Sequence, residues 1–201
     1  MAKCLIKQAE EFFKETNNEW YAFLELVDNY PKIISSWYLK CKHELNKRFD
    51  NEELDNSNIW LYLPEGDFHF KWYIKEFGEK SLGLCLDYST FQLCTHDISI
   101  FDPKIIVDLL KTSIYTPIIS AFQKYEIGDG RNGIIISENG NFSFEDKYYD
   151  GEFDKLRLAW YANYETNQLV DQIVAKVNSF RKNGKLTELI KELNIKARRN
   201  N

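Results

Sequence analysis

Hydrophobic and polar positions alternate most regularly in residues 59–96. Apolar residues recur there at every second position, in short runs that proline, glycine and serine residues separate. A period of two is typical of strands that bury one face. We therefore predict an antiparallel four-stranded meander whose core face holds Ile59, Leu61, Leu63, Phe68, Phe70, Trp72, Ile74, Leu82, Leu84 and Leu86.

Helical spacing replaces this alternation in the first fifty residues. One apolar stripe covers residues 5–13, and a second covers residues 20–27. A third begins at Pro31, which the first turn of a helix accepts because the missing N–H would be unpaired there anyway. These stripes predict three short helices, which either pack on the meander or stand apart as an interaction arm.

A further helix is predicted after the meander. Asp102 and Pro103 begin it, as a capping residue followed by a first-turn proline. Pro117 lies inside the apolar stripe that follows, so we expect a kink or a break near Tyr115. The kinked helix is predicted to cover residues 102–125.

A second β segment follows this helix. Asn139 and Gly140 separate two apolar runs, residues 134–138 and 141–144. An Asn-Gly pair predicts a tight hairpin, because both central residues of such a turn take positive φ. One further strand is predicted at residues 156–161.

Two predicted helices end the chain. Residues 166–180 have apolar side chains at helical spacing on one face, and a narrower stripe covers residues 186–193. The tail from Lys196 onwards is expected to fray.

These elements together predict one α+β domain over residues 1–201. Residues 1–50 form its helical N-terminal part, and residues 166–197 form its C-terminal helices. Residues 59–161 form a β-rich centre that contains the kinked helix. The meander and the second hairpin are able to merge into one sheet.

Charge and composition narrow the classes of function. The chain has a net charge of −5, and 15% of its residues are aromatic. Domains that bind nucleic acid are usually basic, so this balance disfavours a general nucleic-acid binder. Aromatic side chains supply interfaces as well as cores, so their abundance favours an interaction role.

The sequence also predicts a compartment. No apolar run reaches the roughly 18 residues of a membrane helix, and the N-terminus turns acidic before a signal-peptide core forms. We therefore expect a cytoplasmic protein with no membrane segment. Its cysteines, at positions 4, 41, 85 and 94, are then expected to be reduced thiols, although Cys85 and Cys94 lie in adjacent predicted strands.

Metal-ligating side chains gather once, at Cys85, Cys94 and His96. A structural zinc site usually takes four ligands in two close pairs, and neither a CxxC motif nor a second pair is present. We therefore predict no metal and no cofactor. His69 and Asp87 are placed to meet across adjacent strands with Cys85 nearby, and chance alignment on a sheet is the simpler interpretation of that pair.

Glu145 and Lys147 provide an alternative site. They end a predicted strand as Glu-Asp-Lys, which is the second part of an arrangement found in magnesium-dependent nucleases. Asp129 or Glu138 would supply the first acid. Mg²⁺ prefers carboxylate oxygens, so these residues form a possible nuclease site, but three such residues are also common by chance.

The outer face of the meander is the strongest candidate surface. Trp60, Tyr62 and Tyr73 are interleaved there with His69 and Lys71. Aromatic residues beside a few polar ones are the composition of a protein interface. The competing interpretation is that a helix of the same chain covers this face.

The sequence thus predicts a non-enzymatic protein-interaction protein, such as a bacterial immunity or inhibitor protein or an accessory subunit of a defence complex. Its acidic runs favour a partner with a basic surface, since complementary charge speeds association. Two alternatives stay open. One is the metal-dependent nuclease, and the other is nucleic-acid binding through the basic residues Lys196, Arg198 and Arg199.

Overall fold

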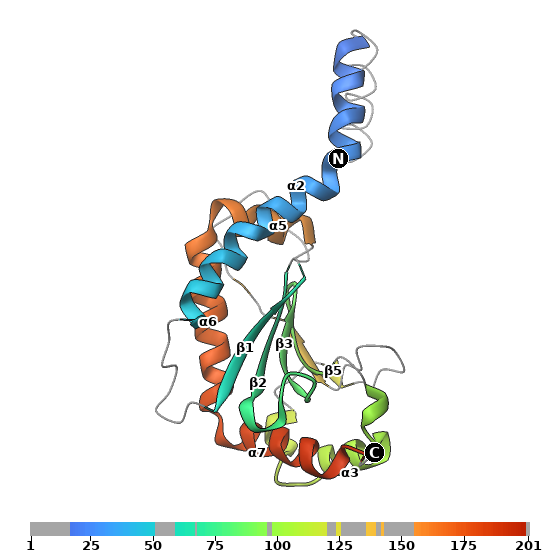
Figure 1. Ribbon diagram of the computed structural model, residues 1–201, viewed down its shortest axis with the longest axis vertical. Coiled ribbons are helices and arrows are strands. Elements are labelled where there is room, and N and C mark those ends of the chain that lie inside the picture. The colour runs from blue at the N-terminus through green and yellow to red at the C-terminus, as the bar shows by residue number, and fades with distance from the viewer. Residues whose placement is uncertain are drawn as a thin grey trace.

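The computed structural model describes residues 17–50, 59–66, 68–95, 98–119, 124–125, 136–139, 142 and 155–199. It has a long N-terminal helix, a central antiparallel sheet and a set of C-terminal helices (Figure 1). The predicted α+β class is therefore confirmed. None of the described helices is long and apolar enough to cross a lipid bilayer.

The first described element is one helix rather than two. Helix α2 runs without interruption from Asn17 to Asp50, with Pro31 inside it. The prediction that Pro31 begins a separate helix is wrong. Because Pro31 is exposed, water can satisfy the carbonyl that its missing N–H leaves unpaired, and the helix bends instead of ending (Figure 1). The predicted helix at residues 5–13 lies outside the described residues.

The two β segments form a single sheet. Its strands are β1 (Trp60–Glu65), β2 (His69–Ile74), β3 (Gly83–Asp87), β4 (Thr90–Cys94), β5 (Lys124–Tyr125) and β6 (Ile136–Asn139), in the order β1-β2-β3-β4-β6-β5. The first four are the predicted meander. β6 pairs with β4 and with β5, all antiparallel, while the predicted partner run at 141–144 lies almost wholly outside the described residues.

The register of β1 differs from the prediction. Trp60 pairs with Ile74, and Tyr62 pairs with Trp72. Trp60 and Tyr62 therefore lie on the core face, while Leu61 and Leu63 lie on the outer face. The alternation itself was present, but both sets of β1 residues are apolar, so the pattern did not decide which set faces the core.

Helices cover the core face of the sheet. α2 packs against β1, α5 (Lys155–Tyr164) and α6 (Thr166–Lys182). Aromatic contacts join these layers: the ring centroids of Phe49 and Tyr62 are 5.0 Å apart, and those of Phe91 and Phe180 are 5.5 Å apart. Such pairs add to the free energy gained by burying apolar surface.

Helix α5 replaces the strand predicted at residues 156–161. Its buried residues are Leu158, Ala159, Tyr161 and Ala162, which recur at helical spacing. The alternating letters Leu-Arg-Leu suggested a strand, but they are too few to separate the two periods. The small side chains of Ala159 and Ala162 let α5 pack closely against its neighbours.

The connecting helix is shorter than predicted. Asp102 caps α3 (Pro103–Leu110) by accepting hydrogen bonds from the backbone N–H of Lys104 and of Ile105, at 2.8 and 3.4 Å. The predicted break is present, because a short α4 begins only at Thr116 and ends at Ile119. The helix does not continue to Tyr125, which belongs to β5.

The C-terminal helices end in an ordered segment. After α6 come α7 (Gly184–Glu192) and a π-helical turn, η3 (Leu193–Ala197). Beyond them, Arg198 forms a β-bridge with Phe101, and the N–H of Arg199 donates to the carbonyl of Ile100 at 2.8 Å. The prediction that the tail frays from Lys196 onwards is therefore wrong as far as Arg199, because backbone hydrogen bonds hold this part to the start of α3.

Candidate interaction surface

The five residues predicted to form one binding patch do not share a face. Trp60 is 5% exposed on the core side, and Tyr62 lies beside it. The hydroxyl of Tyr62 donates to Oδ1 of Asn46 on α2 at 2.8 Å. Tyr62 thus attaches α2 to the sheet. Trp60 and Tyr62 therefore lie on the core face, which α2 covers, and not on the outer face where they were predicted.

The other three predicted residues lie on the outer face of the sheet. His69 pairs with Asp87 across the strands, and its Nδ1 is 3.5 Å from Oδ1 of that aspartate. The expected meeting of these two residues is therefore confirmed. Lys71 is fully buried, its Nζ donates to the carbonyl of Glu79, and burial lowers its pKa to about 8. Burial also raises the pKa of the half-buried Tyr73.

Cys85 and Cys94 form a disulfide, which contradicts the prediction of reduced thiols. The two residues lie diagonally across β3 and β4, with their Cα atoms 6.2 Å apart, which is within the range that a disulfide bridges. The prediction placed the two cysteines in adjacent strands but gave more weight to the expected reducing compartment than to this geometry. His96, the third member of the predicted cluster, lies outside the described residues, and His69 takes its place beside the sulfur atoms.

The alternative sites gain no support from the described residues. Glu145 and Lys147 lie outside the described part of the chain, so the nuclease site stays a prediction. The basic residues at the C-terminus contact their own chain: Lys196 is 3.0 Å from Glu192, and Nη1 of Arg198 is 3.5 Å from the carbonyl of Phe77.

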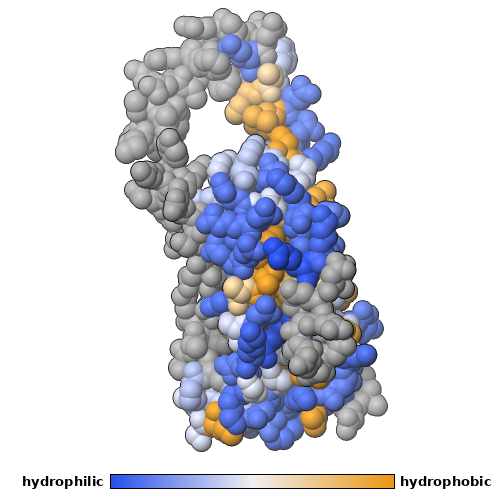
Figure 2. Space-filling model, turned by 90° about the vertical axis from the view of Figure 1, so that its left-hand side faces the viewer, coloured by the Kyte–Doolittle hydropathy of each residue, from blue (hydrophilic) through white to orange (hydrophobic). Residues whose placement is uncertain are grey.

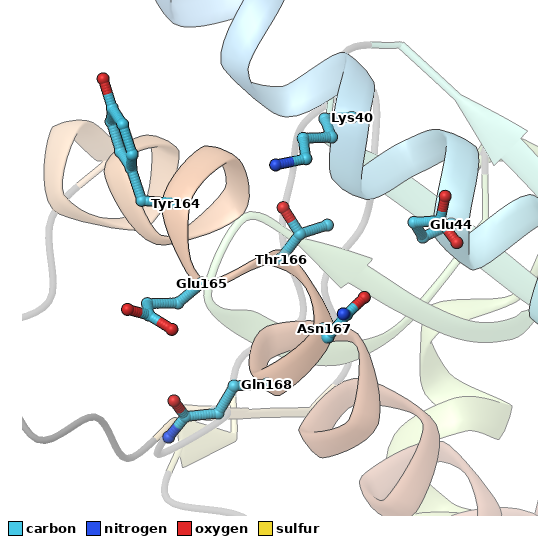
Figure 3. A pocket seen from close by; sticks show the side chains of 7 residues that line it. All are labelled: Lys40, Glu44, Tyr164, Glu165, Thr166, Asn167 and Gln168. Carbon is cyan, nitrogen blue, oxygen red and sulfur yellow. The ribbon is translucent and has the colours of Figure 1, made fainter.

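A polar hollow of about 210 Å³ lies where α2 meets the corner between α5 and α6 (Figure 3). Three of its polar side chains make hydrogen bonds within the chain. Lys40 donates to the carbonyl of Asn163 at 2.7 Å, Glu44 accepts from Lys47 at 2.7 Å, and Thr166 donates to the carbonyl of Ala162 at 2.8 Å. The hollow therefore belongs to the seam that holds the α5–α6 corner on α2.

The surface with the composition of an interface is instead the first half of α2, residues 17–30, which we call the arm. In Figure 1 this half projects beyond the sheet and its covering helices. Figure 2 shows hydrophobic side chains gathered at the same end of the molecule. Exposed apolar residues of the arm are Trp20 (43%), Tyr21 (68%), Phe23 (37%), Leu24 (39%), Leu26 (56%), Val27 (49%) and Tyr30 (45%).

The arm continues an apolar stripe whose other half is core. In the second half of α2, Tyr38, Cys41 and Leu45 are at most 1% exposed. Counting back from Leu45 in alternating steps of four and three residues leads through Cys41, Tyr38, position 34 and Pro31 to Val27 and Leu24. These steps keep residues on one face of a helix. The face that forms the core in one half of α2 is thus half-exposed in the other.

The charged side chains of the arm are all acidic. Residues 17–31 include Glu19, Glu25 and Asp28, and they include no lysine, arginine or histidine. Lys32, the first basic residue beyond the arm, donates to Oδ1 of Asn29 at 3.3 Å. An apolar stripe beside acidic side chains is complementary to an apolar surface bordered by basic ones.

Sequence reasoning proposed an interaction arm among the first helices but placed the binding site elsewhere. The four-three spacing continues across Pro31 and predicts one long helix, but spacing alone does not show which half of its stripe is exposed. Dividing the helix at Pro31 gives two short stripes, and each one predicts a separate helix with its own core face. The continuity of the stripe along α2 was missed for that reason.

Comparison with known proteins gives no assignment: the chain matches no family model, no curated protein and no solved structure.

Proposed function

We propose that this is a non-enzymatic protein-interaction protein that uses the arm to bind another protein. The observation that supports it is the half-exposed apolar stripe of α2, which continues the helix's own core face. A stripe of this kind buries its apolar surface when a partner lays a matching surface on it. A bacterial immunity or inhibitor protein, or an accessory subunit of a defence complex, is the biological setting that we propose.

The partner that fits is a protein with an apolar patch bordered by lysine or arginine side chains. Burying one large apolar side chain contributes roughly 1.5–3 kcal/mol. Leu24 and Val27 lie on the stripe and are 39% and 49% exposed, so burying the rest of each would contribute about half of that amount towards offsetting the entropic cost of association. Glu25 and Asp28 would attract the basic border and speed the encounter.

Substitution within the arm tests this function. The whole chain, immobilised, is used to capture its partner from a lysate of the source organism, and the partner's Kd is then measured with the purified pair. We expect the double variant Leu24→Gln/Val27→Gln to raise that Kd at least about tenfold, because two apolar contacts are lost. Glutamine is a good helix former, so α2 should remain intact.

Leu39→Gln is the matched control. Leu39 lies on the same helix and is 55% exposed, but it is off the apolar stripe and beyond the arm. The Leu39→Gln variant should bind the partner with the same Kd as the wild type. An equal loss in both variants, or no loss in either, would contradict binding through the arm. Cleavage of nucleic acid by the purified chain with Mg²⁺ would favour the nuclease alternative instead.

A further inference from the structure

The outer face of the sheet brings two cysteines and a histidine together. Cys85 on β3 and Cys94 on β4 form the disulfide, and His69 on β2 lies beside it. One ring nitrogen of His69 and the two sulfur atoms all lie within 4.8 Å of one another. The proposed interaction through the arm does not use this cluster.

We propose that the cluster becomes a zinc site when the disulfide is reduced, with Cys85, Cys94 and His69 as ligands. Thiolate and imidazole are the ligands that zinc prefers in proteins. A tetrahedral zinc ion with bonds of about 2.0–2.3 Å holds its ligand atoms roughly 3.3–3.8 Å apart. The imidazole then moves about 1 Å towards the sulfur atoms, a distance that rotation of the side chains supplies.

The carboxylates around His69 complete the site. Oε2 of Glu65 is 3.4 Å from Nε2 of the ring, and Oδ1 of Asp87 is 3.5 Å from Nδ1. Whichever nitrogen binds the metal, the other keeps a carboxylate beside it, which orients the ring and strengthens it as a ligand. The carboxylate on the metal side, or a water molecule, supplies the fourth position.

The burial of the three ligands suits a metal site. Cys85 is fully buried and Cys94 is 5% exposed, so the sulfur atoms are shielded from water. The side chain of His69 is 24% exposed, and that of Asp87 is 46% exposed. Two shielded sulfur ligands and a partly exposed imidazole give zinc a way in from the surface.

The redox step needs a two-electron reductant. In a cell a dithiol passes two electrons and two protons to the Cys85–Cys94 bond and itself closes to a disulfide. In the test, a phosphine gives the two electrons and takes an oxygen atom from water, whose two protons reach the sulfur atoms. Zn²⁺ then forms two Zn–S bonds and releases both thiol protons.

Cobalt and zinc titrations of the full chain test this site. The chain is reduced with a phosphine under anaerobic conditions and titrated with Co²⁺, which reports tetrahedral thiolate ligation by its visible and near-ultraviolet absorption. We expect one Co²⁺ per reduced chain, its displacement by Zn²⁺, and no such absorption from the oxidised chain. Cys85→Ala/Cys94→Ala should abolish the signal. His69→Gln should weaken Zn²⁺ affinity at least about tenfold while sulfur ligation remains.

His43→Gln is the control for the histidine, since His43 is exposed on α2 and is not a member of the cluster. It should bind as the wild type does. The proposal is overturned if the reduced chain shows no cobalt–thiolate absorption, or if His69→Gln and His43→Gln bind zinc equally. Near-ultraviolet circular dichroism follows the fold throughout. Loss of the fold on reduction that zinc does not restore would also overturn the proposal.

Discussion

At the scale of single residues, one buried amide joins the last helical turn to the sheet. Asn194, 3% exposed, accepts from the N–H of Leu82 and donates to the carbonyl of Leu82, both at 2.9 Å, and it donates to the carbonyl of Ile190 at 2.8 Å. Residues 112 positions apart are thereby held together. No periodic pattern of residues predicts a hydrogen bond of this kind, so it was not expected from the sequence.

We expect Asn194→Ala to lower the free energy of unfolding by about 2–4 kcal/mol, because it leaves buried backbone groups of Leu82 without hydrogen bonds. Urea denaturation measures the change. Asn167→Ala, at an exposed position of α6, is the control and should stay within about 0.5 kcal/mol of the wild type. Equal effects at the two positions would show that the amide does not have this structural role.

Lys71 is the second residue whose role can be measured, through the dependence of stability on pH. Burial lowers its pKa from 10.5 to about 8 in the folded chain. Between these two values the unfolded chain holds the proton and the folded chain does not, so stability should rise with pH across this window. We expect a rise of roughly 1–3 kcal/mol that Lys71→Met removes, because methionine does not titrate. Urea denaturation of the wild type and of Lys71→Met at pH 7, 8.5 and 10 measures this difference. If the free energy of unfolding changed with pH in the same way in both, the prediction would be contradicted.

At the scale of elements, the sequence predicted which helices and strands are present better than it predicted their ends and their buried faces. The meander, the cap at Asp102 and the helix over residues 166–180 follow from local pattern and turn chemistry, and the structure contains them. The face of β1 and the identity of α5 were missed. In both places the short run of letters fitted two structures, and only long-range pairing with β2 or packing on α2 decided between them.

The bend in α2 leads to a prediction about Pro31. A proline inside a helix removes one backbone hydrogen bond and crowds the preceding turn, at a cost of about 3 kcal/mol. Pro31 is exposed, so alanine there should introduce no cavity. We expect Pro31→Ala to raise helix content and to stabilise the chain by about 1–3 kcal/mol, as measured by circular dichroism and urea denaturation. A destabilised variant would mean that the bend is required for packing.

The β3–β4 hairpin depends on its disulfide. The bonded cysteines are nine positions apart, and closing a loop of this length stabilises a chain by about 2–3 kcal/mol through the entropy of its unfolded state. Reduction in the presence of a metal chelator should lower the free energy of unfolding by that amount. The variant Cys85→Ala/Cys94→Ala should no longer respond to the reductant. A response of the same size in that variant would show that the reductant does not act through the Cys85–Cys94 bond.

At the scale of the whole molecule, the two halves of α2 have different tasks. The half beyond Pro31 closes the core against the sheet, α5 and α6, and the arm extends the same apolar stripe away from that core. The candidate site was therefore not recoverable from periodicity alone. A stripe has the same spacing whether its own chain or another protein covers it, and only the extent of the core shows where the chain's own packing ends.

Photo-cross-linking from the arm tests the proposed interaction most directly. A photoreactive phenylalanine analogue is placed at Val27 in one chain and at Leu39 in another, and each is irradiated with the captured partner. We predict a covalent adduct from position 27, mapped to an apolar segment bordered by basic residues in the partner, and none from position 39. Adducts from position 39 alone, or equal yields from both positions, would contradict binding through the arm.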